Sequence, residues 1–129
     1  MKLAIEATRS SPRVVFDPVN RVLEITGESY PENSFEFFAP LFTWLRDELP
    51  RHDGVTVRVH ITYMNSSSTK CMLDILDILC DRVRGGKSIQ VQWYYDDGNE
   101  RAYELAEEFR EDMDIPFDII AVEPRDTHR

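Results

Sequence analysis

The sequence has no apolar run long enough to cross a membrane, and positive charge is scarce in it. An acidic residue, Glu6, follows the start too closely for the apolar core of a signal peptide. The 15 lysine and arginine residues face 24 aspartate and glutamate residues, so the net charge is -9. This sign opposes attraction to nucleic-acid phosphates and to anionic lipids. We therefore expect a soluble cytoplasmic protein that binds neither nucleic acid nor membranes.

Cysteine and histidine are also few, and neither is spaced for a disulfide or a metal site. Cys71 and Cys80 lie in one predicted helix, separated by ~13 Å at about 1.5 Å per residue. This is too far for a mutual disulfide, so both are expected to be small buried residues. The histidines, His52, His60 and His128, show no metal-ligand spacing. The sequence thus predicts no metal ion and no cofactor.

The apolar pattern predicts an α/β fold. With 129 residues the chain has room for one core, so we expect a single domain over residues 1–129. Strand-like and helix-like apolar patterns alternate along the chain. The expected order is a hairpin of strands 14–17 and 21–26, a helix, strand 55–63, a helix, strand 89–95, a helix and strand 115–122. This order favours a mixed, partly parallel sheet with helices packed on it.

The predicted helices have recognisable ends and apolar stripes. Asn33 or Ser34 is expected to cap the first helix, and Gly85 with Gly86 is expected to stop the second. The predicted apolar face of the first helix consists of Phe35, Phe38, Phe42, Leu45 and Leu49. The spacing of these residues indicates that the helix packs on the sheet along one side.

The most distinctive segment is residues 63–70, Tyr-Met-Asn-Ser-Ser-Ser-Thr-Lys, which joins a strand pattern to a helix pattern. It places hydroxyls at a helix N-terminus, where unpaired N–H groups favour a capping side chain or a phosphate. Capping needs one hydroxyl. Because Ser66, Ser67, Ser68 and Thr69 supply several, the others are available to a kinase. Capping alone is the competing interpretation.

A small hydrolase or ligand-binding domain is a rival hypothesis for the same segment. It would use Ser66 or Ser67 with His60 and a nearby acid in a cleft beside the aromatic cluster around Trp93. However, the segment has no flanking glycine of the kind found in a nucleophile elbow. The aspartates and glutamates fall on polar helix faces, which indicates solvated carboxylates rather than a catalytic pair.

An aromatic run at the end of strand 89–95 suggests a surface for another protein. In a strand, successive side chains point to opposite faces, so Tyr94 points away from Trp93 and Tyr95. At least one of these rings therefore faces away from the core. An exposed tyrosine of this kind is typical of protein interfaces.

Three groups of residues, in this order, resemble the motifs of a known family. They are residues 27–34, residues 63–70 with 72–76, and residues 93–96 followed by 99–102 and 106–112. The strand, hydroxyl run and helix resemble the phosphorylatable site of STAS domains, the anti-sigma-factor antagonist fold. The sequence is still more similar to the SiaC family, small bacterial regulatory phosphoproteins associated with biofilm control, from about residue 14 to residue 117. The resemblance implies a single STAS-like domain.

The resemblance also implies a signalling switch that is not itself an enzyme. In the SiaC family, a kinase phosphorylates the hydroxyl after the junction asparagine, and a PP2C-type phosphatase removes the phosphate. That hydroxyl is Ser66 here, where the family typically has threonine. Ser67 is the second choice, because the acceptor of STAS domains also sits in a paired-serine run, and Ser68 and Thr69 follow. The unphosphorylated form is implied to bind and activate a diguanylate cyclase, which raises cyclic di-GMP.

The expected partner-binding residues surround the acceptor and include the outward tyrosine. They are Asn65, Ser67, Ser68, Thr69, Lys70 and Tyr94. A phosphate adds a charge of about -1.5 to -2, which the first-turn amides tolerate but an acidic or apolar partner surface does not. The remaining alternative is an oligomeric scaffold, such as a homodimer, in which the hydroxyls are only caps.

Overall fold

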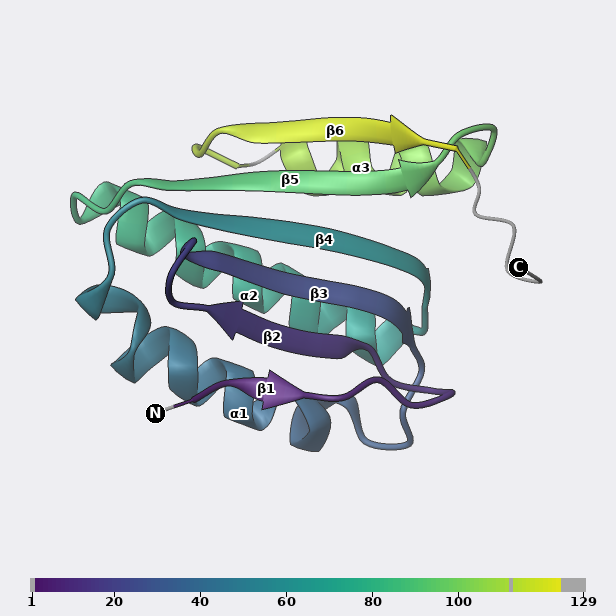
Figure 1. Cartoon of the computed structure of the whole chain (residues 1–129). Coiled ribbons are helices and arrows are strands. Elements are labelled where there is room, and N and C mark those ends of the chain that lie inside the picture. Colours follow the sequence, from purple (N-terminus) through teal and green to yellow (C-terminus); the bar gives the residue numbers. More distant parts are fainter. Residues whose placement is uncertain (1, 112, 124–129) are drawn as a thin grey trace.

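The computed structural model describes residues 2–111 and 113–123, which form one mixed sheet with helices packed on it (Figure 1). In chain order the elements are β1 (Ala4–Ile5), β2 (Arg13–Asp17), β3 (Val22–Ser29), α1 (Ser34–Asp47), a short 3-10 helix (Leu49–Arg51), β4 (Val55–Met64), α2 (Ser66–Arg84), β5 (Ile89–Asp96), α3 (Glu100–Glu111) and β6 (Phe117–Val122). The predicted α/β class and the predicted order from hairpin to last strand are confirmed. The STAS-like detail stays a prediction.

The six strands of the described residues lie in the sheet in the order in which they occur in the sequence. β1, β2 and β3 pair antiparallel, whereas β3, β4, β5 and β6 pair parallel. A helix connects each parallel pair, because the chain must return to the end of the sheet where the previous strand began before the next strand can run parallel to it. The carboxyl ends of β3, β4 and β5 therefore meet at one edge, where the chain enters α1, α2 and α3.

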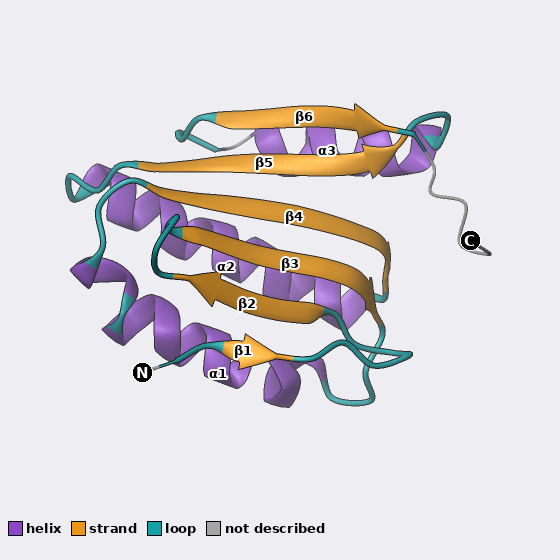
Figure 2. Ribbon diagram, in the orientation of Figure 1, coloured by secondary structure: helices purple, strands orange, loops and turns teal. Residues whose placement is uncertain are grey.

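All three described helices lie against one face of the sheet, behind the strands in Figure 2. The alternation in β4 shows why this face is the core. Val57 and Val59 are buried beneath the helices, whereas Arg58 between them is exposed. Because successive side chains of a strand point to opposite faces, the alternate residues from Val55 to Ile61 are apolar and are buried on the side of the helices.

The opposite face of the sheet carries polar side chains and is left uncovered by the described helices (Figure 1). Arg58 Nε donates a hydrogen bond of 3.0 Å to Gln92 Oε1 across β4 and β5. Tyr94 is half-buried on this face, while Trp93 is buried on the other. The prediction that Tyr94 points away from the core is therefore confirmed.

The buried face of α1 differs from the predicted one. Phe38, Leu45 and Leu49 are buried as expected. Phe35 is 50% exposed, and Leu41 and Trp44 are buried in addition. The buried stripe begins at Ser34 and continues at spacings of four and three residues. Phe35 lies one position later, about 100° around the helix, and so points to solvent.

Several strand boundaries also differ from the prediction, and the largest difference is that β3 continues to Ser29 rather than ending at residue 26. β1 was not predicted, because its two residues are too few to show an alternating pattern. The last strand begins at Phe117 rather than at residue 115. Pro116 has no N–H to donate to the ladder, although its carbonyl accepts from the Val91 N–H at 2.8 Å.

Candidate functional site

The strand-to-helix junction at residues 63–70 is confirmed, but its cap is an asparagine rather than a hydroxyl. β4 ends at Met64, and Asn65 caps α2 by accepting a hydrogen bond of 2.9 Å from the Ser68 N–H at Oδ1. This bond satisfies one of the unpaired donors of the first turn. Asparagine performs this role as well as serine does, so no hydroxyl of the run is needed as the N-cap.

Ser68 is fully buried and belongs to a cluster of serine hydroxyls in the core. Ser29 Oγ donates to Ser68 Oγ at 2.7 Å, and Ser34 Oγ lies 2.9 Å from the same oxygen. These serines come from β3, α1 and α2, so the cluster fixes the three elements to one another. Since no Ser68 surface is exposed, its hydroxyl reaches neither a kinase nor a partner protein. In this structure Ser68 therefore offers no surface to a partner, and its expected partner contact stays a prediction.

A shift in strand register places Ser29 in this cluster. The pairing of β3 with β4 is irregular between Gly27 and Glu28, and after it Ser29 pairs with Met64. Gly27 has a backbone φ of 125°, which residues other than glycine rarely adopt. A Cβ at this position would also lie 3.4 Å from the Cα of Pro12. The glycine therefore permits the irregularity that brings the end of β3 to the first turn of α2.

Ser67 and Thr69 are half-buried, and both hydroxyls are engaged. Ser67 Oγ donates to Asn65 Oδ1 at 3.2 Å and lies 2.8 Å from Ser34 Oγ. Thr69 Oγ1 donates to the Asn65 carbonyl at 3.0 Å. Phosphorylation of either hydroxyl would disrupt bonds that hold the first turn of α2.

Ser66 differs from its three hydroxyl neighbours. It is the first residue of α2, it is exposed, and its hydroxyl has no hydrogen-bond partner among residues 2–111 and 113–123. A kinase can therefore reach this oxygen without breaking an interaction of the fold. In this geometry, Ser66 is the hydroxyl of the run most suited to modification.

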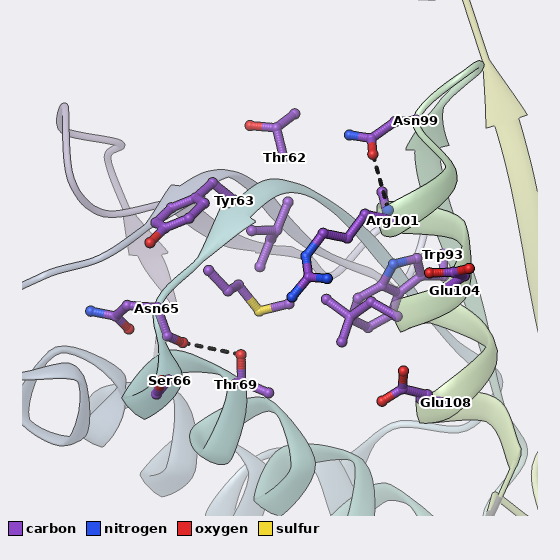
Figure 3. Close-up of a pocket in the computed structure, with 14 residues that line it drawn as sticks. Thr62, Tyr63, Asn65, Ser66, Thr69, Trp93, Asn99, Arg101, Glu104 and Glu108 are labelled. Carbon is purple, nitrogen blue, oxygen red and sulfur yellow. Dashed lines mark hydrogen bonds between the residues drawn. The ribbon is translucent and has the colours of Figure 1, made fainter.

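Ser66 and Thr69 line an open groove of about 650 Å³ between the start of α2 and α3, which we call the α2–α3 groove (Figure 3). Trp93 of β5 also lines it, and α3 contributes Arg101 and Glu104, with Glu108 one turn further along the helix. The side chain of Arg101 points into the groove. A phosphate on Ser66 would thus lie at the rim of a groove that contains both signs of charge.

The predicted partner-binding residues do not form one surface. Asn65 and Thr69 line the α2–α3 groove, and Lys70 is exposed on the same helix. Tyr94 lies on the helix-free face of the sheet and lines a separate hollow of about 270 Å³ with His60. The sheet separates Tyr94 from the hydroxyl run, so a partner bound at the groove does not reach it directly.

The arrangement needed for a serine hydrolase is not assembled. His60 Nε2 lies 3.0 Å from Asp96 Oδ1 on the helix-free face, whereas Ser66 lies by the helices. His52 packs against Trp44 and Phe16 near the end of α1. His128 lies outside the described residues. His60 therefore does not lie beside Ser66, where the hydrolase hypothesis needs it as the general base.

Cys71 and Cys80 are buried free cysteines, as predicted. Burial raises the pKa of the Cys71 thiol, and the nearby Asp74 carboxylate raises it further.

Within residues 2–111 and 113–123, no three histidine, cysteine, aspartate or glutamate side chains are grouped to hold a metal ion. Over the same residues, no helix is both long and apolar enough to span a bilayer.

Sequence reasoning missed the residues that complete the site. Ser29 and Ser34 lie in the segment 27–34 that carries part of the resemblance, but their burial beside Ser68 was not foreseen. A serine at an otherwise apolar, core-facing strand position is the signal that could have identified Ser29. No sequence pattern indicates that Arg101 points into the groove, because the direction of a long side chain depends on how α2 and α3 pack.

Relatives of this chain are found both by sequence and by fold. An uncharacterised protein of Pseudomonas aeruginosa (strain UCBPP-PA14) is 43% identical over 122 residues, which are 92% of this chain and 95% of that protein. The solved structure of SiaC of Pseudomonas aeruginosa matches with a TM-score of 0.86 and 39% identity, covering 95% of this chain and 99% of that chain.

A second solved structure provides a comparison with a complex. It is the crystal structure of diguanylate cyclase SiaD in complex with its activator SiaC from Pseudomonas aeruginosa. Its matching chain has a TM-score of 0.88 and 41% identity, covering 93% of this chain and 99% of that chain. The model of the SiaC family regulatory phosphoprotein matches residues 5–122. This chain therefore belongs to the SiaC family of regulatory phosphoproteins.

Proposed function

We propose that this chain is a cytoplasmic, non-enzymatic switch that binds and activates a diguanylate cyclase while Ser66 is unphosphorylated. A partner kinase phosphorylates Ser66, and a PP2C-type phosphatase restores the hydroxyl. The relative SiaC, which is an activator in complex with the diguanylate cyclase SiaD, supports the choice of partner. The observation that carries the choice of site is the exposed, unbonded hydroxyl of Ser66 beside three engaged hydroxyls, within the described residues.

The position of Ser66 explains how a phosphate changes binding without unfolding the domain. Ser66 begins α2, so the partial positive charge of the helix N-terminus stabilises a phosphate there. The first turn of α2 contains no acidic residue that would oppose this charge. The phosphate therefore acts on a docked partner, through repulsion and desolvation, rather than on the fold.

Exposed aromatic side chains next to Ser66 provide apolar area for a partner. Tyr63 is 56% exposed and Tyr30 is 37% exposed, and their rings meet edge to face with centroids 5.8 Å apart. Phe35 is 50% exposed in the first turn of α1, directly after the Ser34 that contacts Ser67. Aromatic residues at the centre of an interface contribute much of the binding free energy. A phosphate on Ser66 would place charge beside this apolar surface.

The absence of catalysis is part of the proposal. The hydroxyl run would need a general base, and His60 is instead bonded to Asp96 on the other face of the sheet. In the proposed role, Ser66 accepts a phosphoryl group from a separate kinase and catalyses nothing. The domain supplies an acceptor and a docking surface.

Phosphate mapping tests this function directly. The chain is purified from cells of its source organism that lack the phosphatase, and tandem mass spectrometry locates the phosphate. We expect phosphate on Ser66, and a Ser66→Ala variant from the same cells should carry none. A phosphate found only outside residues 66–69 would remove the proposed site. If the Ser66→Ala variant still carries a phosphate on Ser67, the acceptor is Ser67 rather than Ser66.

A further inference from the structure

Arg101 is a cation without an ion pair among the described residues. The chain forms helical ion pairs elsewhere: Arg110 pairs with Glu107 at 3.7 Å, three residues before it on α3. Glu104 lies three residues after Arg101, the reverse order of charges, and no ion pair joins Arg101 to Glu104 or to any other residue in positions 2–111 and 113–123. Its side chain points into the α2–α3 groove instead (Figure 3). The exposed Arg101 side chain is therefore not held by a carboxylate of its own helix.

The position of Arg101 within α3 also opposes the helix dipole. Cations stabilise the last turn of a helix and disfavour the first, where the partial charge is already positive. α1 and α3 follow this rule, with Arg46 and Arg110 in their last turns. Arg101 lies in the first turn of α3, next to Glu100. A cation at this position does not stabilise the helix, but it can bind an anion that lies outside the helix.

Across the groove from Arg101 lies the first turn of α2, where the residue that would carry the anion is Ser66. α1 and α3 each have an acidic residue in the first turn, Glu36 and Glu100, but α2 has none. Among the described residues that line the groove, Arg101 is the one cation, and it shares the groove with Glu104 and Glu108. The groove thus holds a cation opposite a helix N-terminus that lacks a negative charge.

We propose that Arg101 binds the phosphate of phosphorylated Ser66 and so ties the start of α2 to α3. The planar guanidinium donates parallel hydrogen bonds to phosphate oxygens, a charge-assisted and geometrically specific contact. The bridge spans the α2–α3 groove and closes it to a partner. This inference rests on the proposed function, because it assigns a receptor to the phosphate that the switch adds. It makes the off state an intramolecular contact as well as a source of repulsion.

The other charges near Ser66 define the alternatives to this bridge. Glu104 and Glu108, which line the groove from α3, repel the phosphate. Lys70 lies four residues after Ser66 on α2, at the spacing of a helical ion pair, and is the competing cation. Whether Arg101 or Lys70 receives the phosphate is therefore the decisive comparison.

Phosphoserine installed at position 66 during translation, by genetic code expansion, tests the bridge without any kinase. Phosphorus-31 NMR then reports the second pKa of the phosphate, ordinarily near about 6. We expect Arg101→Gln to raise this pKa by about 0.5 unit, because the nearby cation favours the dianion. Arg101→Lys keeps the positive charge but loses the two parallel N–H donors of the guanidinium. The phosphate pKa in this variant should therefore lie between the values of the parent protein and of Arg101→Gln. Arg110→Gln, on the same helix outside the groove, should leave the pKa unchanged.

The possible outcomes separate this inference from the proposed function. An unchanged pKa in Arg101→Gln, with the fold intact by circular dichroism, overturns the bridge while leaving Ser66 as the acceptor in cells. A shift seen in Lys70→Gln and absent in Arg101→Gln assigns the phosphate to Lys70 and also overturns it. Absence of cellular phosphate on Ser66 overturns the proposed function, whereas a shift in Arg101→Gln still supports the bridge as chemistry of this groove.

Discussion

Ser29 Oγ and Ser68 Oγ lie 2.7 Å apart in the core, and this bond joins the end of β3 to the first turn of α2. Ser34 Oγ lies 2.9 Å from the same Ser68 oxygen, so α1 joins the cluster as well. Buried hydroxyls are costly unless they are hydrogen-bonded, and each of these has a partner. The cluster therefore stabilises the relative positions of the three elements beneath Ser66.

Replacement of the central hydroxyl should destabilise the fold. Ser68→Ala leaves the Ser29 hydroxyl without its partner, so we expect the free energy of unfolding to fall by about 1–3 kcal/mol. Ser66→Ala removes an exposed, unbonded hydroxyl and should change it by less than about 0.5 kcal/mol. Urea denaturation followed by circular dichroism measures both. Equal midpoints for the two variants would show that the cluster does not stabilise the fold.

The helix cap can be tested separately from the hydroxyls. Asn65→Ala removes the acceptor of the Ser68 N–H bond and should lower the free energy of unfolding by about 1 kcal/mol. Asn65→Asp keeps an acceptor and adds a favourable charge at the helix N-terminus, so its stability should match the parent protein. Amide hydrogen exchange in the first turn of α2 is the local measurement. Faster exchange in both variants would contradict the capping role.

Charge at Ser66 should weaken partner binding, whereas loss of the hydroxyl should not. On the proposed function, we expect Ser66→Ala to bind the diguanylate cyclase partner as the parent protein does, and Ser66→Glu to bind it about tenfold more weakly. Ser88→Glu is the matched control, because Ser88 is exposed just before β5, at the edge of the sheet far from the start of α2. Calorimetry measures the affinities. Equal affinity for all three variants would remove the switch from Ser66.

The buried thiol of Cys71 predicts a loss of stability in alkaline solution. Burial, and then the Asp74 carboxylate, raise the folded-state pKa of this thiol above its ordinary value of 9.0. Above pH 9.0 the unfolded chain therefore releases a proton that the folded chain retains, which favours unfolding as pH rises. Urea midpoints at pH 7 and about pH 10 should fall more in the parent protein than in Cys71→Ala. Parallel changes in both proteins would contradict this role.

The junction and its two flanking elements could be predicted from the sequence because each has a strong local pattern. Alternation in β4 and helical spacing in α2 leave little freedom for residues 63–70, and the structure places the junction there. The partners of the hydroxyls could not be predicted in the same way. Ser29 and Ser34 reach Ser68 through contacts 39 and 34 residues apart in the chain, which local patterns do not report.

The difference at α1 has a similar cause. Its aromatic residues offer two adjacent apolar stripes, one through Phe35 and one through Leu41 and Trp44. Only the packing of α1 against α2 and the sheet decides which stripe is buried. Phe35 consequently remains on the surface beside the junction, where it is available to a partner. The sequence alone could not distinguish a core residue from a docking residue here.

The serine cluster has a consequence for the timing of the switch. Because the hydrogen bonds of Ser29, Ser34 and Ser68 join the three elements beneath Ser66, a kinase and a cyclase acting as proposed would meet the same backbone arrangement. No segment has to refold when a phosphate arrives or leaves. The response time of the pathway would then depend on the turnover of the kinase and the phosphatase and on partner dissociation, not on a slow conformational step in this domain.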